Sequence, residues 1–175
     1  MSKWYEDVQK QQDVYTFTRA RLARNIKGHV FPGKMEEAEA GQMVAELREG
    51  LSGLGLSYRD LSRSTDAYRR GLAERRVLNS GLAKKTSPMG LFLSENESES
   101  ILLCGDDHIR IQCIQGGLAF RSTWDQANLT DDWISKRFPY AFDQKYGYLT
   151  AFPTNVGTGL RACVLLKLIQ MVLTV

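Results

Sequence analysis

The stretch Gly147–Leu165, GYLTAFPTNVGTGLRACVL, joins a strand-like run, a glycine-punctuated turn and an arginine. The run Tyr148–Phe152 ends at a proline, and a polar turn follows before the chain enters a second apolar segment. Gly157 and Gly159 allow positive φ and are expected to leave backbone N–H groups open to an anion. Arg161 adds a planar guanidinium fork that suits phosphate oxygens. Most such turns are ordinary loops, so this turn alone does not establish an anion-binding site.

Composition indicates one globular domain. The chain has 175 residues, of which 43% are hydrophobic, and this is enough for a sizeable core. It contains no run of 18 apolar residues and no signal-peptide core at its start, which predicts a soluble, cytoplasmic protein without a membrane partner. The net charge of +3 is too small to indicate nucleic-acid binding by itself. Three cysteines without CxxC spacing are predicted to be small buried residues rather than disulfides or zinc ligands: Cys104, Cys113 and Cys163.

Arginines are concentrated near the start of the chain and again at residues 69–76. In the strand-like segment Val14–Leu22, a period of two places Arg19 and Arg21 on the same side as Tyr15 and Phe17. The two arginines would lie about 7 Å apart, which suits neighbouring phosphates. Solvated basic faces that bind nothing are the alternative, and they explain most such patterns.

Two carboxylates precede another alternating segment, Gly105–Gln112, which reads GDDHIRIQ. Alternation predicts one face with His108, Arg110 and Gln112 and a core face with Ile109, Ile111 and Cys113. A polar strand face usually meets solvent. Here the neighbouring acids suggest that the face binds a cation or takes up a proton.

The remaining pattern predicts scaffold. Apolar spacing indicates a helix over residues 34–51, a second helix is predicted over about residues 58–76, and a hairpin joins residues 90–94 to 100–104. A further helix over residues 122–137 would open with a capping box from Ser122 to Asp125. A strand is predicted to enter the core after Arg161.

The string GYLTxxPTNVGTGLRA resembles the signature of the ATP:guanidino phosphotransferases, or phosphagen kinases, and most nearly that of the bacterial protein arginine kinase branch. Three more segments agree with that branch in the same order: TRARLARN at residues 18–25, DDHIRIQ at 106–112 and FDQKYGYLT at 142–150. The resemblance covers about Val14 to Thr174. It implies an α+β fold with a mostly antiparallel sheet flanked by helices, as in creatine kinase and glutamine synthetase catalytic domains. It also implies that residues 1–175 are the N-terminal two-thirds of a phosphagen kinase catalytic domain.

Family members transfer the γ-phosphoryl group of Mg-ATP to a guanidino nitrogen, so the resemblance implies a kinase that uses ATP and Mg²⁺. The favoured acceptor is an arginine side chain of a protein, and a small guanidino compound is the alternative. Asp106 would be the catalytic residue that orients the guanidinium and takes up its proton, and no residue is assigned as a metal ligand. The nucleotide-binding positions implied by the resemblance are Phe17, Thr18, Arg19, Ala20, Arg21, Arg76, Arg110, Arg161, Ala162, Cys163, Val164 and Leu165.

The chain departs from the family pattern at four functional positions. Phe17 replaces a serine, Arg76 a histidine and Asp106 a glutamate, and Phe152 replaces a cysteine that lies beside the guanidino substrate in the family. Asp106 keeps the charge but reaches about 1.5 Å less. A displacement of about 1 Å can cost on the order of 10²-fold in rate. In the family, a portion beyond the position of Val175 supplies another phosphate-binding arginine and a second substrate carboxylate.

Nucleotide binding is therefore expected to survive better than catalysis. We expect no measurable arginine phosphorylation from residues 1–175 alone, and a catalytically dead nucleotide-binding pseudokinase remains the alternative function. Residues 162–168 and 169–175 are expected to leave an apolar patch and to favour self-association. An RNA-binding domain is disfavoured because no aromatic-rich basic platform is present.

Overall fold

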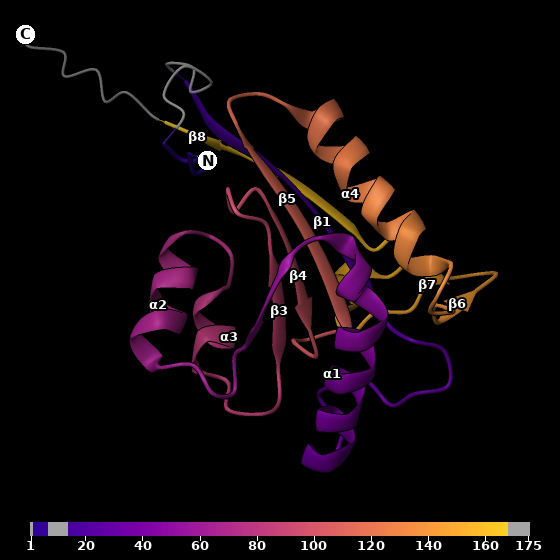
Figure 1. Cartoon of the computed structure of the whole chain (residues 1–175). Coiled ribbons are helices and arrows are strands. Elements are labelled where there is room, and N and C mark those ends of the chain that lie inside the picture. Colours follow the sequence, from indigo (N-terminus) through magenta and orange to yellow (C-terminus); the bar gives the residue numbers. More distant parts are fainter. Residues whose placement is uncertain (1, 7–13, 168–175) are drawn as a thin grey trace, which may run out of the picture.

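The computed structural model describes residues 2–6 and 14–167. Six strands form one sheet in the order β2-β3-β4-β5-β1-β8, and every pairing in it is antiparallel (Figure 1). The strands are β1 Tyr15–Arg24, β2 Ser57–Asp60, β3 Gly90–Leu93, β4 Glu99–Leu103, β5 Ile109–Gly116 and β8 Leu160–Leu166; a separate two-stranded ribbon pairs β6 Phe142–Asp143 with β7 Gly147–Tyr148. The helices are α1 Glu37–Leu51, α2 Asp66–Glu74, α3 Ser80–Lys84 and α4 Phe120–Ser135, and short 3₁₀ turns cover Ser52–Leu54 and Pro153–Asn155.

One face of the sheet is covered by α1 and α4 (Figure 1). Ile101 and Ile111 point from β4 and β5 into this core, where they meet Leu47 of α1 and Ile134 of α4. All four side chains are fully buried, and burial of a side chain of this size is worth roughly 1.5–3 kcal/mol. The alternating pattern predicted for residues 109–113 is therefore confirmed for its apolar half.

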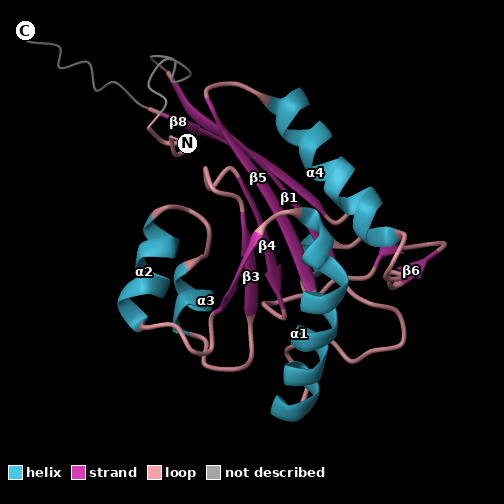
Figure 2. Cartoon of the chain, viewed as in Figure 1, coloured by secondary structure: helices cyan, strands magenta, loops and turns pink. Residues whose placement is uncertain are grey.

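The opposite face has a helical cover only over part of its width. Leu102 alternates with Ile101 and packs instead with Leu72 of α2 and Leu82 of α3. Figure 2 shows α2 and α3 beside β3, on the side away from β1 and β8. The part of this face formed by β1, β8 and the adjoining part of β5 is consequently free of helices among the described residues.

The predicted helix over residues 58–76 is wrong for its first eight residues. Tyr58 lies in β2, which pairs with β3 at the edge of the sheet, and α2 begins only at Asp66. Thr65 is the N-cap, because its hydroxyl accepts a 3.2 Å hydrogen bond from the Tyr68 N–H. The segment contains an edge strand followed by a helix, and the sequence pattern alone did not show the boundary between them.

The capping box at Ser122 is also wrong. Helix α4 begins two residues earlier, and its N-cap Ala119 makes no side-chain capping bond. Instead the Thr18 hydroxyl of β1 accepts from the Ala119 N–H at 2.9 Å, so a strand supplies the partner of the helix start. Ser122 donates to the Gln115 side chain at 2.7 Å.

Two strand predictions near the C-terminal end need correction. Of Tyr148–Phe152, only Tyr148 belongs to a strand, because the following N–H groups are bonded elsewhere: Leu149 N–H donates to the Ala141 carbonyl and Ala151 N–H to Asp107. The strand after Arg161 exists as β8, but it lies at the sheet edge and is largely exposed instead of entering the core. Leu165 and Leu166 of β8 are exposed, but as successive strand residues they lie on opposite faces, and residues 168–175 lie outside the described residues, so the apolar patch stays a prediction.

Other predictions are confirmed. The helix of residues 34–51 is α1, the hairpin is formed by β3 and β4, and the first strand is β1. Cys104 and Cys113 are buried thiols, and Cys163 is half-buried. Among the described residues, no helix has both the length and the apolar character needed to cross a bilayer.

Candidate functional site

Three neighbouring strands present four arginines on the helix-free part of the sheet. Arg21 of β1 is directly opposite Arg161 of β8, and Ala23, two residues along, is opposite Arg110 of β5. Residues two apart share a face, so Arg19 lies on this face too. Directly opposed Cβ atoms are about 4.5–5.5 Å apart, and like charges in that position are destabilising. The register therefore creates a cluster of like charges, which we call the arginine cluster.

The arginine cluster has no ion-paired acid among the described residues, although the charge of Asp106 partly offsets the lowering of the pKa of Arg21 and Arg110. Within residues 2–6 and 14–167, none of its members forms a salt bridge, and the buried Nε of Arg19 has no hydrogen-bond partner. Burial, followed by the charge of Arg21, lowers the pKa of Arg110 to about 10. Burial also lowers the pKa of Arg21, with smaller contributions from Arg19 and Arg161. A bound anion would relieve this repulsion.

The arginine cluster borders two hollows that share lining residues. The larger, of about 700 Å³, is lined by Arg21, Arg110 and Arg161 and also by Asp106 and Phe152. Its volume lies within the usual range for a small-molecule site. The smaller, of about 460 Å³, shares Arg21 and Arg110 and is completed by Arg19, Arg76, Glu74 and Gln112 among others.

Asp106 is held at the larger hollow by its neighbour. Asp107 is 3% exposed, and its Oδ1 accepts 2.7 Å hydrogen bonds from Asn25 Nδ2 and from the Ala151 N–H. Burial raises the pKa of Asp107, and these two bonds oppose the rise. Asn25 in turn accepts from the His108 N–H at 2.9 Å. Of the two adjacent acids, Asp107 fastens the turn and Asp106 is left half-exposed in the hollow.

His108 does not share the open face, which corrects the sequence prediction. Its ring is fully buried: Nδ1 accepts from the Ile26 N–H, and Nε2 donates to the Val30 carbonyl, both at 3.0 Å. Burial lowers the pKa of His108 to about 4. The ring is therefore neutral at physiological pH and stabilises the turn. Gln112 does face the smaller hollow, where its Nε2 donates to the Arg76 carbonyl at 2.8 Å.

Gly157 and Gly159 of the signature turn both have positive φ, and Gly159 is also required by close packing. Their N–H groups are not open to an anion, since Gly157 donates to Tyr148 and Gly159 to Asn155. Gly159 has φ +65°, and a Cβ there would come within 2.3 Å of Arg24 Nη1. Arg24 uses that nitrogen to donate to the carbonyls of Ala23 and Thr158, both at 2.9 Å. The prediction of an anion-binding turn is wrong, although the turn leads directly into β8, which carries Arg161 of the arginine cluster.

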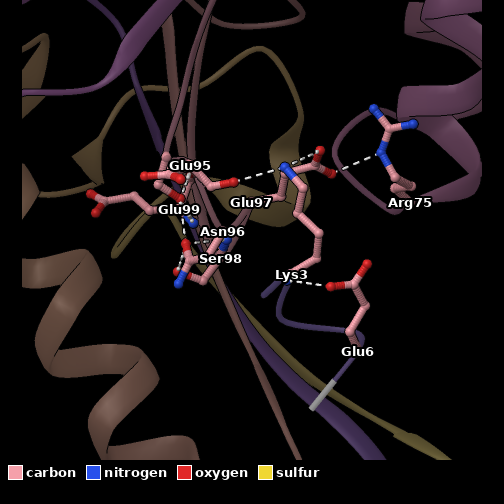
Figure 3. Close-up of polar contacts among 9 residues, drawn as sticks. Lys3, Glu6, Arg75, Glu95, Asn96, Glu97, Ser98 and Glu99 are labelled. Carbon is pink, nitrogen blue, oxygen red and sulfur yellow. Dashed lines mark hydrogen bonds and ion pairs between the residues drawn. The ribbon is translucent and has the colours of Figure 1, made fainter. Parts of the chain in front are cut away.

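Arg76 is placed by contacts that the sequence did not suggest. Its neighbour Arg75 donates to the buried Glu97 carboxylate at 2.8 Å, and Lys3 Nζ approaches the same carboxylate at 3.3 Å (Figure 3). Lys3 Nζ also donates to the Glu95 carbonyl at 2.8 Å. These bonds fix the end of α2, where Arg76 adopts φ +68° at the rim of the smaller hollow.

Several predicted nucleotide-binding residues do not present side chains to either hollow. Thr18 donates to the Gly117 carbonyl on the α4 side, and Ala20 lies in the core beneath α1 and α4. Phe17 is buried against the Trp4 ring, with centroids 5.5 Å apart. On β8, Cys163 is opposite Arg19 and Leu165 opposite Phe17, whereas Ala162 and Val164 alternate to the other face.

Sequence reasoning missed the basic residues at the end of α3. Lys84 and Lys85 line the larger hollow. Lys85 Nζ donates to the carbonyls of Cys104 and Gly105 at 3.2 and 2.6 Å, immediately before Asp106. No spacing connects the pair to Asp106 along the chain, so this contact had no sequence signal.

Residues 39–175 match the family model described as ATP:guanido phosphotransferase, C-terminal catalytic domain. The chain belongs to this family. The protein-arginine kinase of Bacillus velezensis is 39% identical to it over 181 residues, which cover 99% of this chain and 49% of that protein. The protein-arginine kinase of Bacillus subtilis is 38% identical, again over 99% and 49% of the two chains. The chain thus spans about half the length of these relatives.

Solved phosphotransferase structures share the fold. A duplicated taurocyamine kinase from Schistosoma mansoni, with bound transition state analog components, gives a TM-score of 0.82 at 25% identity, over 95% of this chain and 26% of that one. Lombricine kinase gives 0.77 at 22% identity, over 97% and 54%. The predicted α+β class, an antiparallel sheet flanked by helices, is confirmed.

Proposed function

We propose that this chain binds an adenine nucleotide on its arginine cluster, as the nucleotide site of a kinase that transfers the γ-phosphoryl group of ATP to arginine side chains of proteins. The observation that supports this most directly is the convergence of four guanidinium groups without a carboxylate partner among the described residues. The protein acceptor is supported by the name shared by the curated relatives, protein-arginine kinase.

The arginines supply the kind of catalysis that phosphoryl transfer requires. The reaction needs positioning and neutralisation of charge on the transferred group more than covalent assistance. Arg21 and Arg161, opposed across β1 and β8, would grip adjacent phosphates, and Arg110 would approach from β5. Arginine forks suit these oxygens because two N–H groups can bind one phosphate.

Asp106 is the residue proposed to orient the acceptor guanidinium. It is a half-exposed carboxylate in the same hollow as Arg21, Arg110 and Arg161, so it faces the place where a phosphate would lie. A carboxylate can accept two N–H groups from a guanidinium and then take up the proton released on transfer.

Mg²⁺ fits this site as the counter-ion of the nucleotide. Among the described residues, no group of three or more acidic, histidine or cysteine side chains could hold a metal on its own. Mg²⁺ in kinases is commonly bound by substrate phosphates, waters and one or two carboxylates. The nucleotide phosphates and water would supply the oxygen ligands here, which leaves Asp106 to the acceptor, and the ion would offset phosphate charge.

Calorimetric titration of Mg-ADP tests the nucleotide site. Arg110→Ala and Arg161→Ala should each weaken binding about 10- to 100-fold, because hydrogen bonds to charged groups are worth roughly 1.5–3 kcal/mol. Raising the salt concentration should weaken the wild type as well. Arg121→Ala is the matched control, since Arg121 is exposed on α4 across the sheet. Unchanged affinity in both cluster variants would refute the site.

Transfer is tested separately, by mass spectrometry of phosphoarginine on a test protein. For residues 1–175 alone we expect none, because Asp106 reaches about 1.5 Å less than glutamate. Phosphoarginine that disappears in Arg161→Ala would contradict this expectation and would leave the nucleotide site standing.

A further inference from the structure

Phe152 is an aromatic side chain exposed at the wall of the larger hollow. It is 50% exposed and lines that hollow together with Asp106, Arg110 and Arg161. Among the described residues, no aromatic ring packs against it and no Lys or Arg lies over it. Its ring thus remains available to a ligand.

Hydrogen bonds hold the backbone that carries this ring. The Phe152 carbonyl accepts from the Thr150 hydroxyl and from the Asn155 N–H, both at 2.9 Å. The preceding N–H, that of Ala151, donates to the Asp107 carboxylate at 2.7 Å. Phe152 and Asp106 are therefore each next to one partner of this part-buried hydrogen bond, which ties their two backbone segments together at the hollow.

A carboxylate and an aromatic ring recognise different parts of a guanidinium. The N–H groups lie in the plane of the group and suit a carboxylate, whereas its two faces stack on aromatic rings. The two contacts can form at the same time without competing. Such complementarity matters in this hollow because Arg21, Arg110 and Arg161 repel any cation that enters.

We propose that Phe152 is an acceptor-binding residue whose ring stacks on the guanidinium of the acceptor while Asp106 binds its edge. The inference rests on the proposed function, since it concerns the acceptor of that reaction. It gives the site selectivity for a planar cation, so a guanidinium is preferred over an uncharged ureido group of the same shape.

The test is an NMR titration of the 175-residue chain with N-acetylarginine amide, in the presence of saturating Mg-ADP and also without nucleotide. The neutral isostere, N-acetylcitrulline amide, is titrated in parallel. The affinity and the ring-current shift of the ligand δ-methylene protons are recorded for the wild type, Phe152→Leu and Phe152→Trp. Phe120→Leu is the control, because Phe120 is a similarly exposed phenylalanine, 46% exposed, at the start of α4.

Phe152→Leu should weaken arginine-amide binding about 3- to 10-fold and abolish the upfield shift, in keeping with the strength of cation–π contacts. Phe152→Trp should retain both, and Phe120→Leu should change neither. Equal affinity in Phe152→Leu, equal affinity for the citrulline amide, or no arginine-amide binding by the wild type would each overturn the inference. Loss of Mg-ADP binding alone would overturn the proposed function, because the nucleotide-free titration still tests Phe152.

Discussion

Arg24 and Arg21 lie on the same strand, β1, but on opposite faces of the sheet and in opposite electrostatic environments. Arg24 is 3% exposed and bonded to the Asp131 carboxylate of α4, with Nη2 to Oδ2 at 2.8 Å. Its guanidinium also lies 3.7 Å from the centroid of the Tyr148 ring. Arg21 has no ion-pair partner in the described chain, and the like charges of Arg19 and Arg161 lower its pKa in addition to burial.

This difference separates a structural arginine from one available for binding. A buried charge that is paired and fully hydrogen-bonded joins elements of the fold. Here Arg24 joins β1, α4 and the turn at Thr158. A cluster of like charges without ion-paired partners weakens the fold, so its presence points to an external anion. The arginine content of β1 alone could not make this distinction.

Substitution of Arg24 should have the largest effect. Arg24→Ala leaves Asp131 buried without its partner, and breaking a buried pair typically costs about 3–5 kcal/mol of unfolding free energy. Arg21→Met should leave stability unchanged or slightly raised, because it removes charge repulsion. Urea unfolding of the two variants measures both. Equal losses of stability would remove the distinction between the two arginines.

His108 provides a pH-dependent comparison with the arginine cluster. Its folded-state pKa of about 4 lies below the usual 6.5, so the neutral ring stabilises the fold above pH 6.5. This contribution, about 3 kcal/mol, should be lost as the pH falls from 6.5 towards 4. The physical cause is burial of the ring, which disfavours the charged form, whereas the hydrogen bond from Nε2 to Val30 opposes this lowering of the pKa.

Unfolding free energies at pH 7 and pH 4.5 check this expectation. His108→Gln should reduce the drop between the two pH values, and His29→Gln, which alters the exposed neighbouring histidine, should leave it nearly unchanged. A drop that is as large in His108→Gln as in the wild type would assign the pH dependence to other groups.

The sequence predicted much of the fold and of the arginine cluster for identifiable reasons. Strand alternation places Arg19 and Arg21 on one face, and the structure confirms it. The sheet register, which brings Arg110 and Arg161 beside them, depends on contacts between distant segments and has no local signal. The family resemblance supplied this grouping in advance.

Other features could not be predicted because they depend on hydrogen bonds between distant parts of the chain. Gly159 looked like a source of an open N–H, but tertiary packing against Arg24 explains it. Asp107 and Asp106 are chemically identical in the sequence, and only the bonds from Asn25 and Ala151 bury one of them. Phe152 looked like a loss of function until its position beside Asp106 was known.

The most direct test of the central claim compares nucleotides that differ in phosphate number. Mg-ADP, AMP and adenosine are titrated calorimetrically into the wild type and into Arg21→Met, which is expected to keep full stability. If the arginine cluster binds phosphates, Arg21→Met should weaken Mg-ADP about 10- to 100-fold, weaken AMP less, and leave adenosine unchanged. Equal affinity of the two proteins for Mg-ADP, or an equal loss for all three ligands, would contradict the account.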